Sequence, residues 1–184
     1  MYVWARMIRI AATYRRRGPF RAGDESRLTF RCLPTDIDPN LHLNNARYMM
    51  LADCGRLDIF FRSGLLKLTR SRNWGPLMGG VQAVYVREIR LWKRFDVVST
   101  IETWEESQII GRHRFLLEDG TTAAVVMTTA GIYDFANRHF IRAGEVIEAL
   151  GYEDRPRPPT EAERAFMASH ANIRAFARQA VPGP

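Results

Sequence analysis

Apolar positions recur at helical spacing in two stretches of the first half of the chain. In residues 1–14, four apolar residues share one face, which lies next to a basic face: Val3, Met7, Ile10 and Tyr14. This spacing predicts a short amphipathic helix. A longer run follows from Asn44, a good N-cap residue, to Gly64, a plausible stop. Because residues 48–61 are apolar around much of the circumference, we expect this second helix to be mostly buried.

The pattern then changes from helical to extended. Residues 73–80 are rich in turn formers, whereas the next four runs are rich in Val, Ile, Thr and aromatic side chains, as is typical of strands. These runs cover residues 81–91, 96–103, 109–117 and 121–133. Asp119-Gly120 predicts a tight hairpin between the last two. We therefore expect a four-stranded antiparallel meander, preceded by a short strand over residues 27–33.

Two further helices are expected near the end of the chain, over residues 142–150 and 161–179, with a proline-rich link at residues 155–159. One face of the last helix carries Phe166, His170, Ile173 and Ala177. The predicted organisation is a basic N-terminal segment (1–24), one folded domain (25–150), and a link with a C-terminal helix (151–184).

The order of elements predicts an α+β fold. A sheet of about five strands with one apolar face needs a cover, and a helix of about 20 residues is long enough to lie across it. We expect the sheet, of five to six strands, to wrap the long helix. Such a sheet leaves an edge strand that must be paired or protected, so a homodimer is expected.

Composition narrows the class of protein. With 184 residues, 46% of them hydrophobic, the chain can bury a single core without covalent staples. The two cysteines, Cys32 and Cys54, cannot form a disulfide framework or a four-ligand zinc site alone, which favours a reducing compartment such as the cytoplasm. The histidines show no paired spacing that suggests a metal site, so none is expected. Cys54 falls within the buried helix and is expected to be an inert core thiol.

The net charge of +7 points to an acidic partner: nucleic acid, anionic lipid or a phosphate-bearing small molecule. Nucleic acid is disfavoured because no recognisable module interleaves aromatic and basic residues. Six arginines crowd the first 21 residues: Arg6, Arg9, Arg15, Arg16, Arg17 and Arg21. Two interpretations of this head stay open. Its helix packs on its own domain or a twin subunit, or it dips Trp4, Met7 and Ile10 into a bilayer surface, giving peripheral membrane contact through residues 1–17. Neither a transmembrane span nor a signal peptide is predicted.

Candidate chemistry concentrates in residues 35–48, the loop that leads into the long helix. It holds two carboxylates, an imidazole and two amides. A helix N-terminus offers unpaired N–H groups that can polarise a carbonyl, and Asp38 has the reach to attack that carbonyl or activate water. Asp and Asn are also ordinary turn formers and caps, so composition alone leaves the role of this loop open.

The spacing of the loop resembles a known signature. Asp36-x-Asp38-x-x-x-His42-x-Asn44-Asn45-x-x-Tyr48 is similar to the motif of hotdog-fold acyl-CoA thioesterases of the 4-hydroxybenzoyl-CoA thioesterase-like type. With Ala46-Arg47-Tyr48, Gly55-Arg56, Arg62-x-Gly64 and Gly79-Gly80, the chain is particularly similar to the branch called thioesterase superfamily member six and its bacterial relatives. The likeness runs from about residue 27 to residue 133.

The resemblance implies a hotdog fold, a homodimer or dimer of dimers, and an active site at the subunit interface. It makes Asp38 the catalytic carboxylate, acting as nucleophile or general base on a thioester, while the N–H near Asn45 holds the carbonyl oxygen. His42 would lie beside the thioester and orient Asp38, water or the leaving thiol. Asn44 would cap the helix, and Asp36 would shape the loop. The resemblance implies no cofactor, since CoA is part of the substrate.

CoA carries several phosphate charges, so a basic groove is required. Candidates are Arg87, Arg90, Lys93, Arg94, Arg112 and Arg114, although each alone also fits a solvated strand or turn residue. Asn44, Tyr48, Gly79 and Gly80 complete the expected substrate-binding set, the glycines through close backbone packing. Asp53 is expected to pair with an arginine. The alternative function is a non-catalytic acyl-thioester or lipid-binding hotdog protein at a membrane surface.

Overall fold

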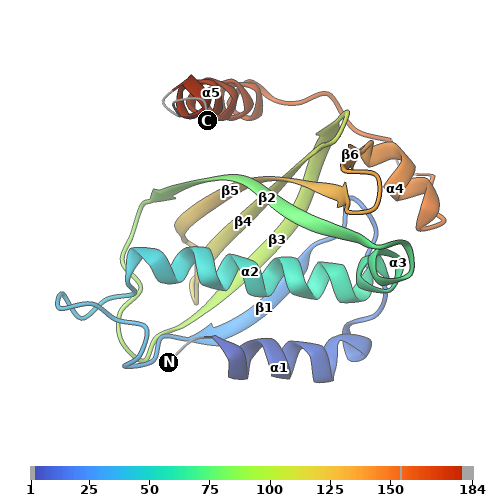
Figure 1. Cartoon of the computed structure of the whole chain (residues 1–184). Coiled ribbons are helices and arrows are strands. Elements are labelled where there is room, and N and C mark those ends of the chain that lie inside the picture. The colour runs from blue at the N-terminus through green and yellow to red at the C-terminus, as the bar shows by residue number, and fades with distance from the viewer. Residues whose placement is uncertain (1–2, 154, 180–184) are drawn as a thin grey trace.

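A curved antiparallel sheet wraps one long helix (Figure 1), which confirms the predicted α+β fold. The computed structural model describes residues 3–153 and 155–179. The helices are α1 (Trp4–Thr13), η1 (Tyr14–Arg17, a 3₁₀ turn), α2 (Asn45–Arg62), α3 (Leu65–Arg72), α4 (Ala143–Ala149) and α5 (Glu161–Gln179). The strands are β1 (Ser26–Arg31), β2 (Trp74–Tyr85), β3 (Arg94–Glu105), β4 (Gln108–Leu117), β5 (Thr122–Asp134) and β6 (His139–Ile141).

The sheet has six strands, in the order β1-β3-β4-β5-β2 with β6 paired to β5. The predicted meander is right for β3, β4 and β5, and Gly120 closes its last hairpin with a φ of 81°. It is wrong for β2, which pairs with β5 and forms an edge of the sheet.

The prediction of turns over residues 73–80 is also wrong for all but Asn73, because residues 74–80 form the first half of β2. Pro76 is tolerated there because the strand lies at an edge, and the register shift between Met78 and Gly80 accommodates the glycine pair. The strand then ends at Tyr85, six residues before the predicted end at residue 91. Helix α3 and strand β6 were not anticipated.

Helix α2 begins and ends where its sequence predicts. The Asn44 side chain accepts a hydrogen bond from the backbone N–H of Ala46 (2.9 Å), and Gly64 follows in the left-handed conformation. Gly55 marks a close approach of α2 to the sheet, because a Cβ atom there would lie 2.0 Å from Ser99 Oγ on β3. The missing side chain therefore lets the helix lie directly on the strands.

The basic head folds against its own domain. Val3, which caps α1, and Ile10 within it are buried in the main core, and Tyr14 stacks on Phe61 with ring centroids 5.0 Å apart. Figure 1 shows α1 beside β1, at the edge of the sheet opposite β2. The interpretation that this helix packs on its own domain is thus confirmed for its inner face. The alternative is wrong for Met7 and Ile10, which cannot enter a bilayer because Ile10 is buried and Met7 packs against the core. Within the described residues, no helix is both long and apolar enough to cross a bilayer.

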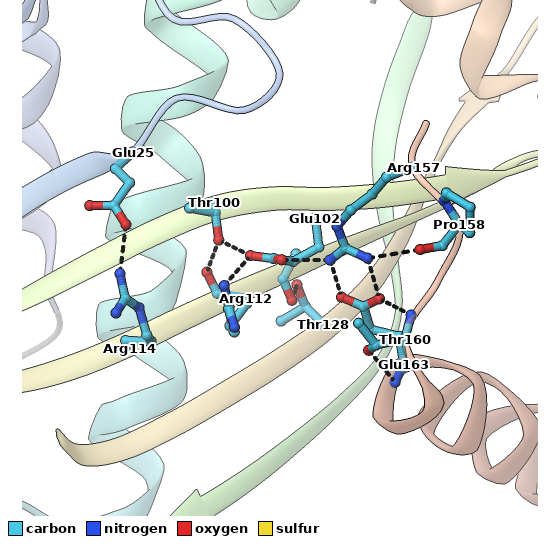
Figure 2. A network of polar contacts seen from close by, with 11 residues as sticks. Glu25, Thr100, Glu102, Arg112, Arg114, Thr128, Arg157, Pro158, Thr160 and Glu163 are labelled. Atoms are coloured by element: carbon cyan, nitrogen blue, oxygen red, sulfur yellow. Dashed lines mark hydrogen bonds and ion pairs between the residues drawn. The ribbon is translucent and has the colours of Figure 1, made fainter. Parts of the chain in front are cut away.

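Helix α5 is anchored to the sheet by a charged network around Arg157 (Figure 2). Arg157 donates to Glu102 Oε2 on β3 (2.8 Å) and to both carboxylate oxygens of Glu163 (2.6 and 2.8 Å). Glu163 also accepts from the N–H of Thr160 (2.7 Å), which completes a capping box at the start of α5. Hydrogen bonds from Arg157 lower the pKa of Glu163 to about 2. Of the predicted apolar face, Phe166 is buried, whereas Ile173 is exposed.

Candidate active site

The loop between β1 and α2 projects past the N-terminus of α2, at the left of Figure 1. Its two sides meet in an isolated bridge between Ile37 and Leu43. Within it, Asp38 N–H donates to the carbonyl of His42 (3.1 Å), and Leu41 N–H donates to the carbonyl of Asp38 (3.0 Å). Leu41 has a φ of 61°, a conformation that non-glycine residues adopt at some cost and that tends to cluster at functional sites.

The fold of this loop brings Asp38 and His42 together. Asp38 Oδ1 lies 3.5 Å from His42 Nδ1 and accepts a hydrogen bond from the N–H of Asn40 (3.0 Å). The two side chains are 16% and 28% exposed. Oδ2 of Asp38 makes no hydrogen bond to any residue that the structure describes. One oxygen therefore orients the carboxylate, and the other is available for chemistry.

The first turn of α2 leaves one donor available beside this loop. Asn44 uses its side chain to accept from Ala46 N–H (2.9 Å) and its backbone carbonyl to accept from Arg47 N–H (2.8 Å). In the described part of the chain, the N–H of Asn45 has no acceptor. Positive partial charge at a helix N-terminus strengthens such a donor toward a developing oxyanion. The predicted cap is confirmed, and a donor is present at Asn45, where the motif requires one.

Tyr48 lies beneath this turn. Its ring is buried, packing edge-on against Tyr85 (5.0 Å) and Phe115 (4.9 Å). Burial raises the pKa of Tyr48 to about 12. The hydroxyl of Tyr85 donates to the carbonyl of Asn45 (3.2 Å), so the end of β2 also supports the site. Direct contact of Tyr48 with a substrate stays a prediction.

A basic segment runs directly beside the loop. Residues 86–93 leave the sheet after β2, and there Arg90 forms an isolated bridge with His42 while Ile89 accepts from Leu43 N–H (2.8 Å). An open hollow next to this bridge is lined by Arg87, Arg90, Lys93 and Arg94, together with Glu88, Leu117, Glu118 and Asp119. The structure thus brings these four predicted cations to the same end of the molecule as Asp38.

Arg112 and Arg114 do not join this cluster. They lie on β4 and form ion pairs with Glu102 (2.9 Å) and Glu25 (2.6 Å), as Figure 2 shows. Through Glu102, Arg112 joins the network that also holds α5, whereas Arg114 forms a separate pair with Glu25. These partners depend on the folded sheet, so the sequence alone could not separate the two arginines from the cations near the loop.

Gly79 and Gly80 lie in the middle of β2, against α5. His170 Nε2 donates to the carbonyl of Gly79 (2.8 Å), and a Cβ atom on Gly80 would lie 2.6 Å from the His170 ring. The expected close packing is therefore present, but its partner within the chain is His170. Gly80 precedes Tyr85 by five residues, about 16 Å of strand, so neither glycine reaches Asp38 of the same chain. Their role toward a substrate stays a prediction.

A second polar cluster, around His113, was missed by the sequence reasoning. It lines a cavity of about 80 Å³ under the C-terminal half of α2. His113 Nδ1 lies 2.7 Å from Ser99 Oγ, and Arg56 Nη1 donates to His113 Nε2 (3.4 Å). Because Nε2 accepts, the neutral ring carries its proton on Nδ1 and donates to Ser99. Burial lowers the pKa of His113 to about 3.

Arg56 also forms the ion pair with Asp53 that was predicted, and burial lowers the pKa of Arg56 to about 10. It lies eleven residues after Asn45, about 16 Å along the helix, so this cavity is separate from the loop. Cys54 is fully buried, and burial raises the pKa of its thiol to about 11, as expected for an inert core thiol. Among the residues described, no group of acidic, His and Cys side chains is arranged to hold a metal ion.

Comparison with known proteins identifies relatives of this chain. The family model described as the Thioesterase-like superfamily matches residues 32–168. Protein THEM6 of Xenopus laevis is 35% identical over 97 residues, which cover 52% of this chain and 47% of that protein. Protein THEM6 of Drosophila melanogaster is 29% identical over 103 residues, which cover 55% of this chain and 53% of that protein. The chain spans about half the length of the curated relatives it matches.

Several solved structures share the fold. The probable thioesterase YbaW of Escherichia coli superposes with a TM-score of 0.63 at 21% identity, covering 67% of this chain and 95% of that one. The hypothetical protein SAV2348 of Staphylococcus aureus was solved in complex with CoA. It has a TM-score of 0.63 at 17% identity, and the match covers 79% of this chain and 95% of that one. A 1,4-dihydroxy-2-naphthoyl-CoA thioesterase of Synechocystis has a TM-score of 0.61 at 10% identity, covering 72% and 100%. These likenesses show the hotdog fold that the loop motif implied.

Proposed function

Because this chain belongs to the thioesterase-like superfamily, we propose that it hydrolyses an acyl-CoA or acyl-carrier thioester at the loop before α2. The observation that carries the proposal is the pairing of two groups at one end of α2. Among the described residues, one carboxylate oxygen of Asp38 has no hydrogen-bond donor, and the N–H of Asn45 has no acceptor. A nucleophile or base beside an oxyanion donor is the minimum that acyl transfer needs.

In the proposed reaction, the thioester carbonyl oxygen accepts a hydrogen bond from Asn45 N–H. As general base, Asp38 takes a proton from water, whose oxygen bonds to the carbonyl carbon. The C–S bond then breaks, its electron pair stays on sulfur, and the proton passes to the thiolate, which yields a free acid and a thiol. As nucleophile, Asp38 instead forms a mixed anhydride and releases the thiolate, and water hydrolyses the anhydride. His42, which lies 3.5 Å from Asp38, orients the carboxylate in either route.

Cations that line the hollow next to the loop support CoA as the leaving group. Arg87, Lys93 and Arg94 can meet the phosphates of CoA while the thioester lies near Asp38. A solved structure of the same fold contains CoA, which makes this ligand a reasonable first probe.

A second copy of the chain would complete the site. Strand β2 is an edge strand of twelve residues without a charged side chain, and it exposes Leu77, Met78, Val81, Val84 and Tyr85. Helix α5 contacts it only around Gly79 and Gly80 among the described residues. A long apolar edge tends to pair with another strand, and a symmetric β2 pair would satisfy it. Tyr85 at the end of β2 contacts Asn45, so this pairing would place the partner next to the catalytic loop.

Release of free thiol tests the proposed hydrolysis. Purified protein is assayed against acetyl-, hexanoyl-, palmitoyl-, oleoyl- and benzoyl-CoA, with CoA binding measured in parallel by calorimetry. We expect turnover of at least one acyl-CoA well above its spontaneous hydrolysis. CoA binding without thiol release from any of these thioesters would contradict hydrolysis of CoA esters and favour the non-catalytic alternative.

The outer face of α1 favours an additional membrane contact. Trp4 and Ile8 are 63% and 67% exposed, and Arg15 and Arg16 are exposed on the η1 turn that follows α1. An apolar stripe next to cations is typical of helices that lie on anionic bilayers. We expect the protein to co-sediment with phosphatidylserine vesicles and Ile8→Glu to weaken this. A wild-type protein that stays in the supernatant would overturn the contact.

A further inference from the structure

A side chain of α1 reaches the base of the catalytic loop, although α1 lies outside the segment that the family model matches. Arg6 Nη1 donates to Asp36 Oδ1 (3.0 Å), and Arg6 Nη2 donates to Asp36 Oδ2 (2.6 Å). The same Nη2 also donates to the carbonyl of Arg31 at the end of β1 (3.0 Å). The Arg6 and Asp36 side chains are only 14% and 3% exposed. Two parallel charge-assisted hydrogen bonds away from water fix the geometry of both partners.

Asp36 in turn closes the loop. Its Oδ2 atom accepts from Leu33 N–H (2.9 Å), and its own N–H donates to the carbonyl of Leu33 (2.8 Å). Its carbonyl accepts from the N–H of Asn44 (2.9 Å), which lies on the returning side of the loop. Asp36 is therefore the residue at which both sides of the loop and α1 meet.

The two groups that the proposed reaction needs lie on either side of this junction. Asp38 follows Asp36 by two residues, and Asn45 follows Asn44 directly. A shift of Asp36 would therefore change the position of Asp38 relative to the Asn45 N–H. Displacements of about 1 Å between reacting groups can cost a hundredfold in rate.

We propose that Arg6 is a positioning residue: from α1, it holds Asp36 and thereby sets the placement of Asp38 against the N–H of Asn45. The proposal rests on the proposed hydrolysis for its effect on rate, but not for its effect on the loop itself. Through Arg6, the N-terminal segment would contribute to the geometry of the active site.

Arg17 offers a matched control on the same N-terminal segment. Its Nε donates to Asp58 Oδ1 (2.8 Å), and Asp58 is fully buried. Asp58 lies in the second half of α2, where Arg62 Nη1 also donates to it (3.0 Å). Arg17→Gln therefore removes a second anchor of the head at a place remote from the loop.

Steady-state kinetics on an acyl-CoA that the wild type hydrolyses separate positioning from general loosening. For Arg6→Gln we expect kcat to fall by about tenfold or more, with KM changed by less than about twofold. Arg6→Lys, which keeps the charge but not the two-pronged contact, should recover part of the loss. Arg17→Gln should change kcat by less than about twofold. Equal losses of kcat in Arg6→Gln and Arg17→Gln would overturn the proposal.

Hydrogen exchange reports on the loop even if the thioesterase proposal fails. In full-length protein, mass spectrometry of peptides covering residues 36–44 should show exchange about tenfold faster in Arg6→Gln than in wild type, and no such change in Arg17→Gln. Unchanged loop exchange in Arg6→Gln would overturn the positioning role. If Arg6→Gln does not fold, because Asp36 is left as a buried unpaired charge, the double variant R6Q/D36N removes that charge. It should fold and still show the faster loop exchange, and wild-type exchange in it would equally overturn the proposal.

Discussion

Asn44 shows how far local residue chemistry can be predicted. Its role as a cap depends on neighbours one to three positions away, so residue type and spacing were sufficient to predict it. The N–H of Asn45, which has no acceptor among the described residues, follows from the same local geometry. The partner of Asp36 could not be predicted, because Arg6 lies thirty residues earlier in the chain and only folding of the N-terminal segment brings the two side chains together. The burial of Tyr48 agrees with the burial expected for residues 48–61, whereas its ring partners Tyr85 and Phe115 lie on strands far along the chain and could not be predicted.

The buried imidazole of His113 should make stability depend on pH. Its pKa is about 3 in the folded protein and near 6.5 when exposed. Between these values the unfolded chain binds a proton that the folded protein does not. As the pH is lowered from about 6.5 to about 3, the free energy of unfolding should therefore decrease by up to about 1.4 kcal/mol for each pH unit.

Urea unfolding at several pH values measures this slope. His113→Gln should flatten it, whereas the exposed-site variant His139→Gln should retain it. An equal slope in His113→Gln would contradict the assignment.

At the scale of elements, continuous patterns were predictable and interrupted ones were not. The ranges of α2, α5, β4 and β5 agree with their hydrophobic periodicity to within about two residues. Strand β2 was cut short because Gly75, Pro76 and the pair Gly79-Gly80 have the composition of a turn. Its pairing with β5 rather than β3 depends on contacts between distant segments, which no local pattern encodes.

The crossing of α2 over the sheet at Gly55 gives an element-scale prediction. Gly→Ala inside a helix normally stabilises by up to about 1 kcal/mol. At Gly55 the new methyl group would overlap Ser99 Oγ, so we expect Gly55→Ala to destabilise by about 1–3 kcal/mol in chemical denaturation. Gly144→Ala in α4, where nothing lies within 4 Å of the added atom, is the matched control and should not destabilise. Adding Ser99→Gly to Gly55→Ala should restore part of the loss. A neutral Gly55→Ala would contradict the tight crossing.

For the whole molecule, the edge strand β2 was the feature least visible in the sequence and matters most for assembly. The need for a homodimer could be argued from an unpaired edge, but which strand forms that edge could not. The two ends of α2 also have different surroundings that a linear pattern does not reveal. One end carries the loop and the basic hollow, and the other closes an apolar cavity around Arg56 and His113.

A lysine in the middle of β2 tests the proposed dimer. Val81→Lys places a charge on the exposed apolar edge and should raise the dissociation constant of the dimer by about tenfold or more, as measured by sedimentation velocity. Ile8→Lys changes an equally apolar exposed residue on α1, beside the opposite edge of the sheet, and should leave the dimer intact. A monomeric wild type, or a dimer unaffected by Val81→Lys, would contradict β2 pairing.

The most direct test of the proposed chemistry is the rate of thiol release by Asp38→Asn, which keeps the shape of the side chain but removes its charge. The expected result is a kcat/KM lower than that of wild type by about a hundredfold to ten-thousandfold, with CoA binding retained. Asp96→Asn, a carboxylate paired with Arg27 between β1 and β3, serves as the control and should retain wild-type turnover. Undiminished turnover in Asp38→Asn would contradict the assignment of Asp38 as the catalytic carboxylate.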